Sequence, residues 1–535
     1  MKQSHHSIAL LALGTAVALF TLLLGTLRPT LSAAPLTPFA TIITVDSGQD
    51  IDTSLSKTCL SDTPCTLRRA IVQARALTPA ERPVLIQFNI PEDPNEGYNA
   101  NLDVWELGIL TSSNPSVFRT LEGGQITLDG STQPNGRADG PKIFLIGPST
   151  NKDGLVVGVN STGDHDDNVI RGLGFQNFKN HILVNSNGNI FEDNWFGLTS
   201  DGLDVYLRND DPQDGSGSSG LALSDGVLDN IIQNNVFLGL DGVAIAIRGE
   251  TTTVSHNYIG TIADGSVPNK QTDPSLICTP VDWLGGGGLS ADGPDHIMEN
   301  NIIAGLRQEI FSGSTQPDAM WIQSTCDGCI IQNNQIGIDA LGNEVGVCGI
   351  GIDITDGEQI QVLHNEFAET YHTAIFLNGA LYDANTLRGN IVRRSTPWLE
   401  VDGSAKPDNA ILLYTGLPDP LEFFKPAQVT EISGVTVNGT AGAGSACPNC
   451  TIELFLDDTD NITESLQSLA VVTAGANGNW TATLAAPLEA GQGIRTTSTT
   501  AQYNTIPNIS AGTTVGLSVL YVGSHEIYLP MVTRR

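Results

Sequence analysis

Basic residues are scarce in this chain, and their shortage restricts its partners. The 535 residues include 25 Lys and Arg against 58 Asp and Glu, which gives a formal net charge of −33. A surface with this charge repels nucleic acid and anionic lipid, so we expect no nucleic-acid partner. Such a surface favours solubility and can attract divalent cations.

Aromatic residues and long helical patterns are also few, whereas glycine is abundant. Aromatic residues make up 6% of the chain, and there are 57 glycines. Many tight turns with few helices indicate an all-β repeat. The chain is too long for one compact domain, so we expect two or three structural units.

Long apolar runs are missing except at the N-terminus. Lys2 precedes an apolar stretch over residues 8–27, and Ser32, Ala33 and Ala34 follow it. This order predicts that residues 1–34 are a signal peptide. The stretch is also about as long as a membrane span, so an uncleaved anchor is the alternative and the one expected membrane contact. Either way, we expect a secreted or cell-surface protein.

Cysteine is sparse but falls in close sets. The eight cysteines are Cys59 and Cys65, Cys326 and Cys329, Cys447 and Cys450, with Cys278 and Cys348 left over. An even number in an exported chain predicts disulfides. A zinc site shared by the two CxxC pairs is the alternative, but about 118 residues separate those pairs, far beyond zinc-ribbon spacing.

A repeat with a central asparagine dominates the middle of the chain. One copy is Asn189-Ile-Phe-Glu-Asp-Asn194-Trp-Phe196, and each copy has apolar residues three before and two after its asparagine. The aligned asparagines are Asn194, Asn235, Asn257, Asn301, Asn334, Asn365 and Asn390. Alternating apolar residues predict strands. Some copies follow each other by only 22 or 25 residues, too few for a propeller blade of about 40, so we expect coils stacked on one another.

The seven asparagines have two interpretations. In a stacked coil, each amide can donate to the asparagine of the next coil and accept from the previous one. The alternative is a row that binds a ligand. We favour the structural ladder, because an open row would not need the same flanking apolar pair in every copy.

A glycine-bounded segment follows three of the repeats. Gly197 to Gly202, Gly260 to Gly265 and Gly337 to Gly342 each span the same distance in sequence. Because these segments leave at the same point of the coil, they should project from one side. The first two begin the long insertions 199–220 and 261–288, which could form the wall of a groove.

The same residues resemble a known group of proteins. The segment Cys65-Thr-Leu-Arg-Arg-Ala-Ile71, with Cys59 upstream, resembles the CSLREA motif of exported bacterial proteins, although Arg69 replaces the usual Glu. Ile126-Thr-Leu-Asp-Gly-Ser-Thr-Gln-Pro134 resembles a phrase of their first coils. The repeat is similar to right-handed parallel β-helix proteins with the pectate-lyase-like fold. The resemblance covers residues 41 to about 400 and implies no single activity, because this fold hosts lyases, hydrolases, epimerases and adhesins.

These observations divide the chain into six parts. After residues 1–34 come a capping region at 35–118, with an amphipathic helix over 67–77, and the β-helix at 119–405. A proline-rich linker at 406–426 leads to short strands at 427–523. There, Cys447-Pro-Asn-Cys450 and Ala476-Asn-Gly-Asn-Trp480 resemble bacterial immunoglobulin-like modules, which implies a β-sandwich. Residues 524–535 form a tail.

Candidate chemistry is sparse, and we assign no catalytic residue. Asp210, Asp211 and Asp214 could hold Ca²⁺, but we favour a solvated loop without a bound ion; no other cofactor is expected. Trp283 and Trp398 are sugar platforms or buried packing residues.

Three functions remain open on the sequence alone. The first, which we favour, is a non-catalytic adhesive or glycan-binding protein that binds an extracellular polysaccharide or matrix component. The second is a polysaccharide lyase or glycoside hydrolase with its groove on the long-loop side. The third is a structural envelope component. Carboxylates that converge in a cleft would favour the enzyme.

Overall fold

The computed structural model describes most of the chain beyond residue 37. The described residues are 38–51, 56–110, 116–149, 151–159, 165–206, 219–268, 286–306, 318–370, 373–379, 384–395, 410–415, 424–441, 447–460, 462–501 and 511–522. Residues 1–39 and 40–535 form two separate units, and only the second is described below. The predicted export segment at 1–34 lies outside the described residues.

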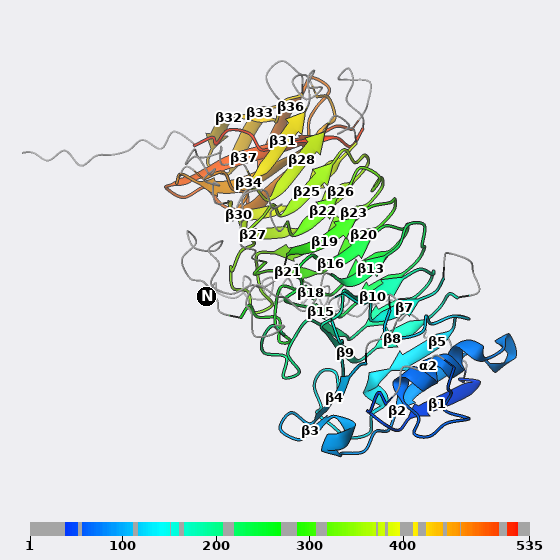
Figure 1. Cartoon of the computed structure of the whole chain (residues 1–535). Helices are drawn as coiled ribbons and strands as arrows, with labels where there is room; N and C mark the ends of the chain where they lie inside the picture. The colour runs from blue at the N-terminus through cyan, green and yellow to red at the C-terminus, as the bar shows by residue number, and fades with distance from the viewer. Residues whose placement is uncertain are drawn as a thin grey trace, which may run out of the picture. The chain divides into compact units, whose positions relative to one another are not determined.

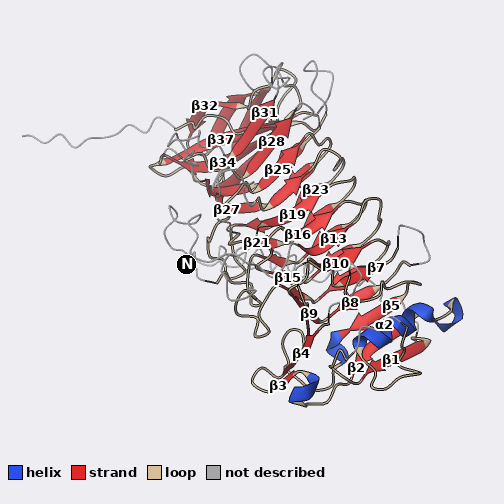
Figure 2. Ribbon diagram, in the orientation of Figure 1, coloured by secondary structure: helices blue, strands red, loops and turns tan. Residues whose placement is uncertain are grey.

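The alternating apolar residues form short strands that belong to three long sheets (Figure 2). The first sheet runs in the order β1 (Thr41–Val45), β2 (Val84–Phe88), β5 (Ile126–Asp129), β8 (Val169–Arg171), β11 (Ile190–Glu192), β14 (Ile231–Gln233), β17 (Thr253–Ser255), β20 (Ile297–Glu299), β23 (Ile330–Gln332), β26 (Gln361–Leu363) and β29 (Thr386–Arg388). All its neighbouring strands are parallel.

The other two sheets contain the remaining strands of each coil. The second runs β7 (Leu155–Val157), β10 (Asn180–Val184), β13 (Ser219–Leu223), β16 (Val243–Ile247), β19 (Gly287–Ala291), β22 (Met320–Ile322), β25 (Ile352–Thr355), β28 (Ile375–Gly379) and β31 (Ile411–Thr415). The third runs β3 (Tyr98–Asn99), β4 (Val104–Gly108), β6 (Ile143–Ile146), β9 (Leu173–Gln176), β12 (Trp195–Phe196), β15 (Val236–Phe237), β18 (Tyr258–Ile259), β21 (Ile302–Ile303), β24 (Gln335–Ile336), β27 (Glu366–Thr370) and β30 (Ile391–Ser395). Apart from the antiparallel pair β3–β4, their strands are also parallel.

Each coil therefore visits the three sheets in turn, and successive coils lie side by side (Figure 1). For example, β11 leads through a two-residue bend to β12, and the chain then returns to β13. This arrangement is a parallel β-helix, so the predicted fold class is confirmed. The sheets begin at β1 and end at β31, beyond the predicted limits of 119 and 405, because the first and last strands lack the asparagine repeat that marked the coils.

A residue with a left-handed backbone makes the bend between the first and third sheets. It immediately precedes each ladder asparagine: Asp193, Asn234, His256, Asn300, Asn333 and His364 have φ between 54° and 57°, and Gly389 has φ 65°. Asn, Asp and His enter this region more readily than most residues, and glycine does so freely. The polar pair in every repeat is thus a bend residue followed by an inward asparagine.

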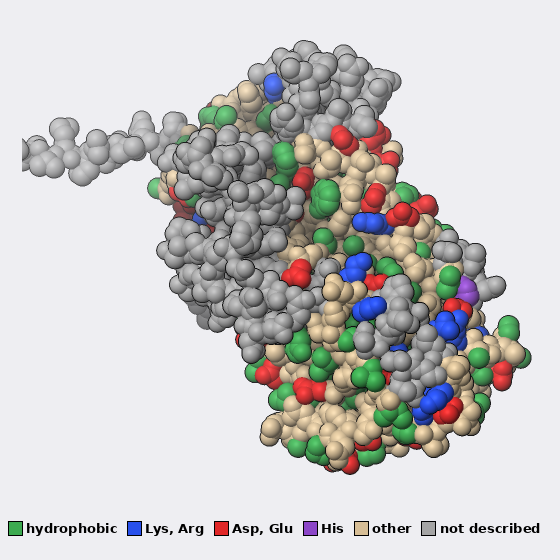
Figure 3. Space-filling view, viewed as in Figure 1, with side chains coloured by type: hydrophobic (Ala, Val, Ile, Leu, Met, Phe, Trp, Pro, Cys, Tyr) green, Lys and Arg blue, Asp and Glu red, His purple; other side chains and the backbone are tan. Residues whose placement is uncertain are grey.

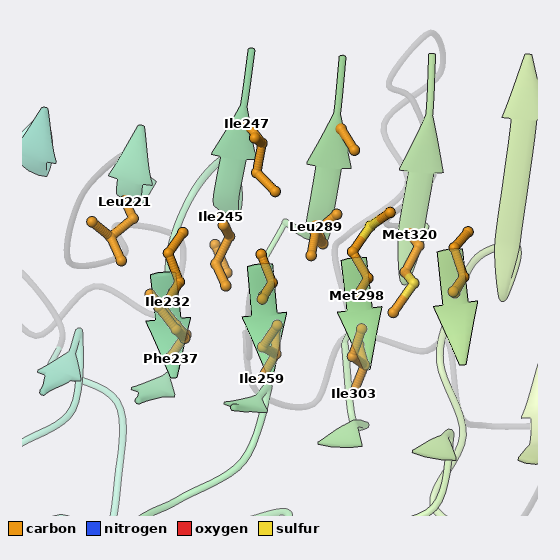
Figure 4. Packing of buried hydrophobic residues seen from close by; sticks show 14 of the residues in the cluster. Leu221, Ile232, Phe237, Ile245, Ile247, Ile259, Leu289, Met298, Ile303 and Met320 are labelled. Atoms are coloured by element: carbon orange, nitrogen blue, oxygen red, sulfur yellow. The ribbon is translucent and has the colours of Figure 1, made fainter. Parts of the chain in front are cut away.

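Apolar side chains fill the interior of the coils. Figure 4 shows Leu221, Ile245 and Leu289 from the second sheet approaching Ile232 and Met298 from the first. Within the third sheet, the rings of Phe175, Phe196 and Phe237 stack with centroids 5.2 and 4.7 Å apart. This row of identical rings follows from the parallel register of β9, β12 and β15.

The one α-helix of the described residues, α2 (Leu67–Ala76), packs against β1 and β2. Thr66 caps its first turn, and Leu67, Ile71 and Ala74 are buried. The buried Arg68 forms a salt bridge with Asp50. The helix thus covers the first coil as the amphipathic pattern predicted. Three short 3₁₀ turns, η1 (Pro79–Glu81), η2 (Pro94–Glu96) and η3 (Gly130–Thr132), lie among the first coils.

Two small antiparallel sheets follow the coils. One contains β32 (Gln428–Ser433), β33 (Thr436–Thr440) and β36 (Asn479–Thr483). The other contains β35 (Gln467–Thr473), β34 (Thr451–Asp458), β37 (Gln492–Thr499) and β38 (Thr514–Val515). They bury Val437, Ile452 and Trp480 in a common apolar core. The resemblance to immunoglobulin-like modules stays a prediction.

Candidate functional site

The structure brings all seven repeat asparagines into one buried column. Each Nδ2 group donates to the Oδ1 atom of the next asparagine, from Asn194 to Asn390, at 2.9 to 3.1 Å. The same Oδ1 atoms accept backbone N–H groups, and the side chains are at most 4% exposed. Because the amides are enclosed and satisfied by one another, the column holds the coils together and is not a ligand site.

A second, shorter asparagine row begins the same repeats. Asn168 donates to Asn189 at 2.8 Å, and Asn189 donates to Asn230 at the same distance. In later coils, Thr252 and His296 stand in this position, and the backbone N–H of Thr252 donates to Nδ1 of His296. The sequence predictions did not include this row, although three copies of the repeat begin with asparagine, because the residue type at this position changes in the other copies.

The cysteines pair locally. Disulfides join Cys59 to Cys65, Cys326 to Cys329 and Cys447 to Cys450. The two CxxC pairs therefore do not share a zinc ion. Cys348 is also in a disulfide, and Cys278 lies outside the described residues.

The predicted Ca²⁺ ligands Asp210, Asp211 and Asp214 lie outside the described residues, as do Trp283 and Trp398. Within the described ranges, one group of carboxylates has ligand atoms within 4.8 Å of one another: Asp457, Asp458 and Glu464, in the C-terminal sheets. Asp457 already forms a salt bridge with Arg495. The group is therefore at least partly neutralised by the protein itself.

The three glycine-bounded segments form hairpin loops stacked on the third sheet. Antiparallel bridges join Leu198 to Val205 and Ile338 to Glu344. The loops also bond to one another, since Ala263 N–H donates to Gly202 and Ala340 N–H donates to Gly265. Residues of the loops and of the third sheet form a separate apolar cluster: Leu198, Val205, Val236, Leu238, Ile262, Val267, Ala304 and Val345. They leave the coils on one side, as their spacing predicted.

These hairpins border a groove of about 1050 Å³ on the third sheet. Its floor is the outward row of β12, β15, β18 and β21, which places Trp195, Val236, Tyr258 and Ile302 side by side. The bend residues Asp193, Asn234, His256 and Asn300 line one side. The hairpin residues Asp201, Ala263 and Asp264 line the other, and residues 137–140 contribute at one end. The groove therefore follows the direction in which the coils stack.

The hairpin glycines lie directly against the two aromatic rings of the floor. A Cβ atom on Gly202 would come within 2.5 Å of the Trp195 ring, and one on Gly265 within 2.9 Å of the Tyr258 ring. Both glycines have a left-handed backbone, with φ of 77° and 82°. Because Gly202 and Gly265 have no Cβ atom, each hairpin can pack closely against the aromatic ring of its own coil.

Arg137 holds Trp195 from the end of the groove. Its guanidinium lies 4.5 Å from the Trp195 ring and 5.3 Å from the Phe144 ring, and it donates to the carbonyl of Ser200. Burial lowers the pKa of Arg137 to about 10, against the opposing effect of Asp201 and Asp139. The side chain therefore remains charged at neutral pH and fixes both the ring and the first hairpin.

Four carboxylates give the groove a negative lining: Asp139, Asp193, Asp201 and Asp264. Asp201 accepts hydrogen bonds from Thr199 and from the N–H of Leu203. Asp264 accepts two from Ser266, which lower its pKa. These two carboxylates therefore hold the hairpin turns. Burial raises the pKa of Asp193.

No family model matches the sequence, and no curated protein does.

Three solved structures are distantly similar. A complex of alginate lyase AlyF-OU02 with G6 shares 12% identity over 60% of this chain and 75% of that one, with a TM-score of 0.30. An alginate lyase from Paenibacillus sp. str. FPU-7 shares 14% over 70% and 98%, with a TM-score of 0.25. The enzymatically active domain of bacteriophage CBA120 tailspike protein 2 shares 8% over 76% and 74%, with a TM-score of 0.27. Such distant likeness assigns neither a family nor an activity, so the fold assignment rests on the sheets themselves.

Proposed function

We propose that this chain is an extracellular glycan-binding β-helix protein whose groove receives a polysaccharide along the coil stack. The observation that carries the proposal is the position of Trp195 and Tyr258 in one row of the groove floor, two coils apart. Two coils correspond to about 10 Å, twice the usual strand spacing. Aromatic faces offer flat apolar surfaces on which sugar rings stack.

The platforms are held in place by the protein. Gly202 and Gly265 let the hairpins pack against the two rings, and Arg137 lies over Trp195. Little side-chain freedom is then lost when a ligand binds, and this pre-organisation favours affinity.

The charge of the groove favours an uncharged polysaccharide. Among the described residues that line it, four are aspartates, and the one arginine packs against Trp195 and Phe144. A uronate-rich chain would meet like charges along the groove. Among the described residues on the face that Figure 3 shows, most basic side chains lie close to acidic ones, a pattern that does not favour a polyanion.

Binding is better supported than cleavage in this groove. Two of its carboxylates hold hairpin turns, and its arginine positions an aromatic ring. Three disulfides fit an oxidising, extracellular environment. Among the described helices, none has the length and apolar character needed to cross a membrane.

Binding of cellohexaose, mannohexaose and trigalacturonate by the full chain, measured by calorimetry, tests the proposal. We expect a neutral hexasaccharide to bind more tightly than the acidic oligomer. Trp195→Ala and Tyr258→Ala should each weaken binding about tenfold, equivalent to about 1.4 kcal/mol. Gln335→Ala is the matched control, because Gln335 occupies the same row beyond Ile302 and does not line the groove. No binding of either neutral sugar, or equal binding by all variants, would refute the proposal.

A further inference from the structure

A second hollow of about 410 Å³ lies on the outer side of the second sheet. Its lining includes Asp241, Gly287, Asp318, Trp321, Asp353 and Asn378, from β16, β19, β22, β25 and β28 or the residues just before these strands. None of these residues lines the groove described above. The hollow is therefore a separate site.

Trp321 offers an open aromatic face in this hollow. Its side chain is 44% exposed, which is unusual beside the neighbouring Met320 and Ile322, both fully buried. In register with Trp321 are Ser290 on one adjacent strand and Asp353 on the other. Gly287, in β19, lies two strands from Asp353, in β25, on the same sheet. Because Gly287 has no side chain, it leaves space in the hollow. A sugar ring stacked on Trp321 would lie next to Asp353.

Two carboxylates with different surroundings converge on the hollow. Asp318 accepts the backbone N–H of Ile350 at 2.9 Å. Asp353 has one carboxylate oxygen, Oδ1, that is buried and has no hydrogen-bond partner within the described residues. Burial raises the pKa of Asp318 to about 7, with a further contribution from the charge of Asp353, and raises the pKa of Asp353 to about 6. Asp241 is the third carboxylate of the lining.

Burial raises the pKa of both carboxyls, and the charge of Asp353 raises that of Asp318 further. Ionisation of one carboxyl therefore opposes ionisation of the other, and near pH 6.5 the pair holds about one proton between them. Hydrolysis of a glycosidic bond uses two carboxyl groups, one protonated and one ionised, on either side of the bond, and both of these carboxyl groups line the hollow.

We propose that Asp318 and Asp353 form an acid–base pair that hydrolyses a glycosidic bond of a polysaccharide stacked on Trp321. This activity goes beyond glycan binding in the groove and does not depend on it. Asp318 donates its proton to the glycosidic oxygen as the bond from that oxygen to the anomeric carbon breaks. Asp353 accepts a proton from the water whose oxygen bonds to the anomeric carbon. One water is consumed, and solvent returns the proton from Asp353 to Asp318.

The release of new reducing ends by the full chain tests this proposal. The substrates are cellohexaose, mannohexaose and chitohexaose, assayed from pH 4 to pH 9. We expect release with a maximum near pH 6 to 7, because one carboxyl must be protonated and the other ionised. Asp318→Asn and Asp353→Asn should each reduce the rate about 100-fold or more. Trp321→Ala should weaken the apparent substrate affinity more than the rate.

Two controls make the result decisive. Asp295→Asn removes an exposed carboxylate from the turn between β19 and β20, one coil before Trp321, which does not line the hollow, and it should leave the rate unchanged. The two proposals can fail separately, because calorimetry with the groove variants measures binding and the release of reducing ends by Asp318→Asn and Asp353→Asn measures hydrolysis. Absence of release from all three substrates, or release that persists in both Asp318→Asn and Asp353→Asn, would overturn the acid–base assignment.

Discussion

His181 is fully buried in the coil interior, where a charged ring could not be stabilised. Its ring meets those of Phe175, Phe178 and Phe196 edge-on, with centroids 5.8 to 6.5 Å apart. Nδ1 donates to the carbonyl of Ser219 at 2.9 Å, because a carbonyl can only accept. Nε2 is buried without a hydrogen-bond partner among the described residues. Burial lowers the pKa of His181 to about 4.

This residue makes stability depend on pH in a defined window. Between about pH 4 and 6.5 the unfolded histidine binds a proton and the folded one does not, so stability falls as the pH falls through this range. We expect the free energy of unfolding to decrease by about 2–3 kcal/mol more in the native chain than in His181→Gln between pH 7.5 and 4.5. Urea unfolding at the two pH values measures this difference. An equal pH dependence in both proteins would show that the ring is protonated in the folded state.

At the scale of the element, the asparagine ladder joins coils that share little else in sequence. Asn257 accepts from both the backbone N–H and the amide of Asn235. It donates to Ile232 and to Asn301. Removing this side chain would leave buried polar groups in three coils without partners. Such groups are costly in a dry interior.

Asn257→Ala should therefore lower the free energy of unfolding by about 2–4 kcal/mol. Gln361→Ala is the matched control, because Gln361 is an exposed amide on β26 and should change stability by less than about 0.5 kcal/mol. Chemical denaturation of the two variants provides the measurement. Similar losses in both would mean that the ladder adds no stability to the stack.

Local repetition explains how much of the fold and site the sequence could predict. The ladder, the hairpin loops and the strand alternation recur within single coils, so they were visible as motifs. The first strands, β1 and β2, were not, because their coils lack the asparagine. Asp318 and Asp353 share no motif either: they line one hollow only because their coils are adjacent in the stack. The outward position of Trp195 depends on the left-handed bend at Asp193, which the sequence did not reveal.

At the scale of the whole chain, the C-terminal sheets cover the edge left by the last coils. The N–H of Thr514 in β38 donates to Asn385, and its hydroxyl accepts the N–H of Leu387 in β29 at 3.0 Å. Glu453 accepts the N–H of Gly389, and the Ser465 hydroxyl accepts the N–H of Val392 in β30. An open strand edge invites pairing with other chains, so these contacts replace the coil that would otherwise follow.

Thr514→Val tests whether this cover stabilises the end of the stack. The change keeps the shape of the side chain but leaves Leu387 N–H without its acceptor, which costs about 1–3 kcal/mol locally. We expect amide exchange in β29 to accelerate about tenfold or more, while exchange in β11, far from the edge, stays constant. Thr436→Val, in β33, removes a hydroxyl away from the coils and should leave β29 unchanged. If β29 exchanged equally in all three proteins, the last coils would be stable by themselves, and the C-terminal sheets would serve another purpose.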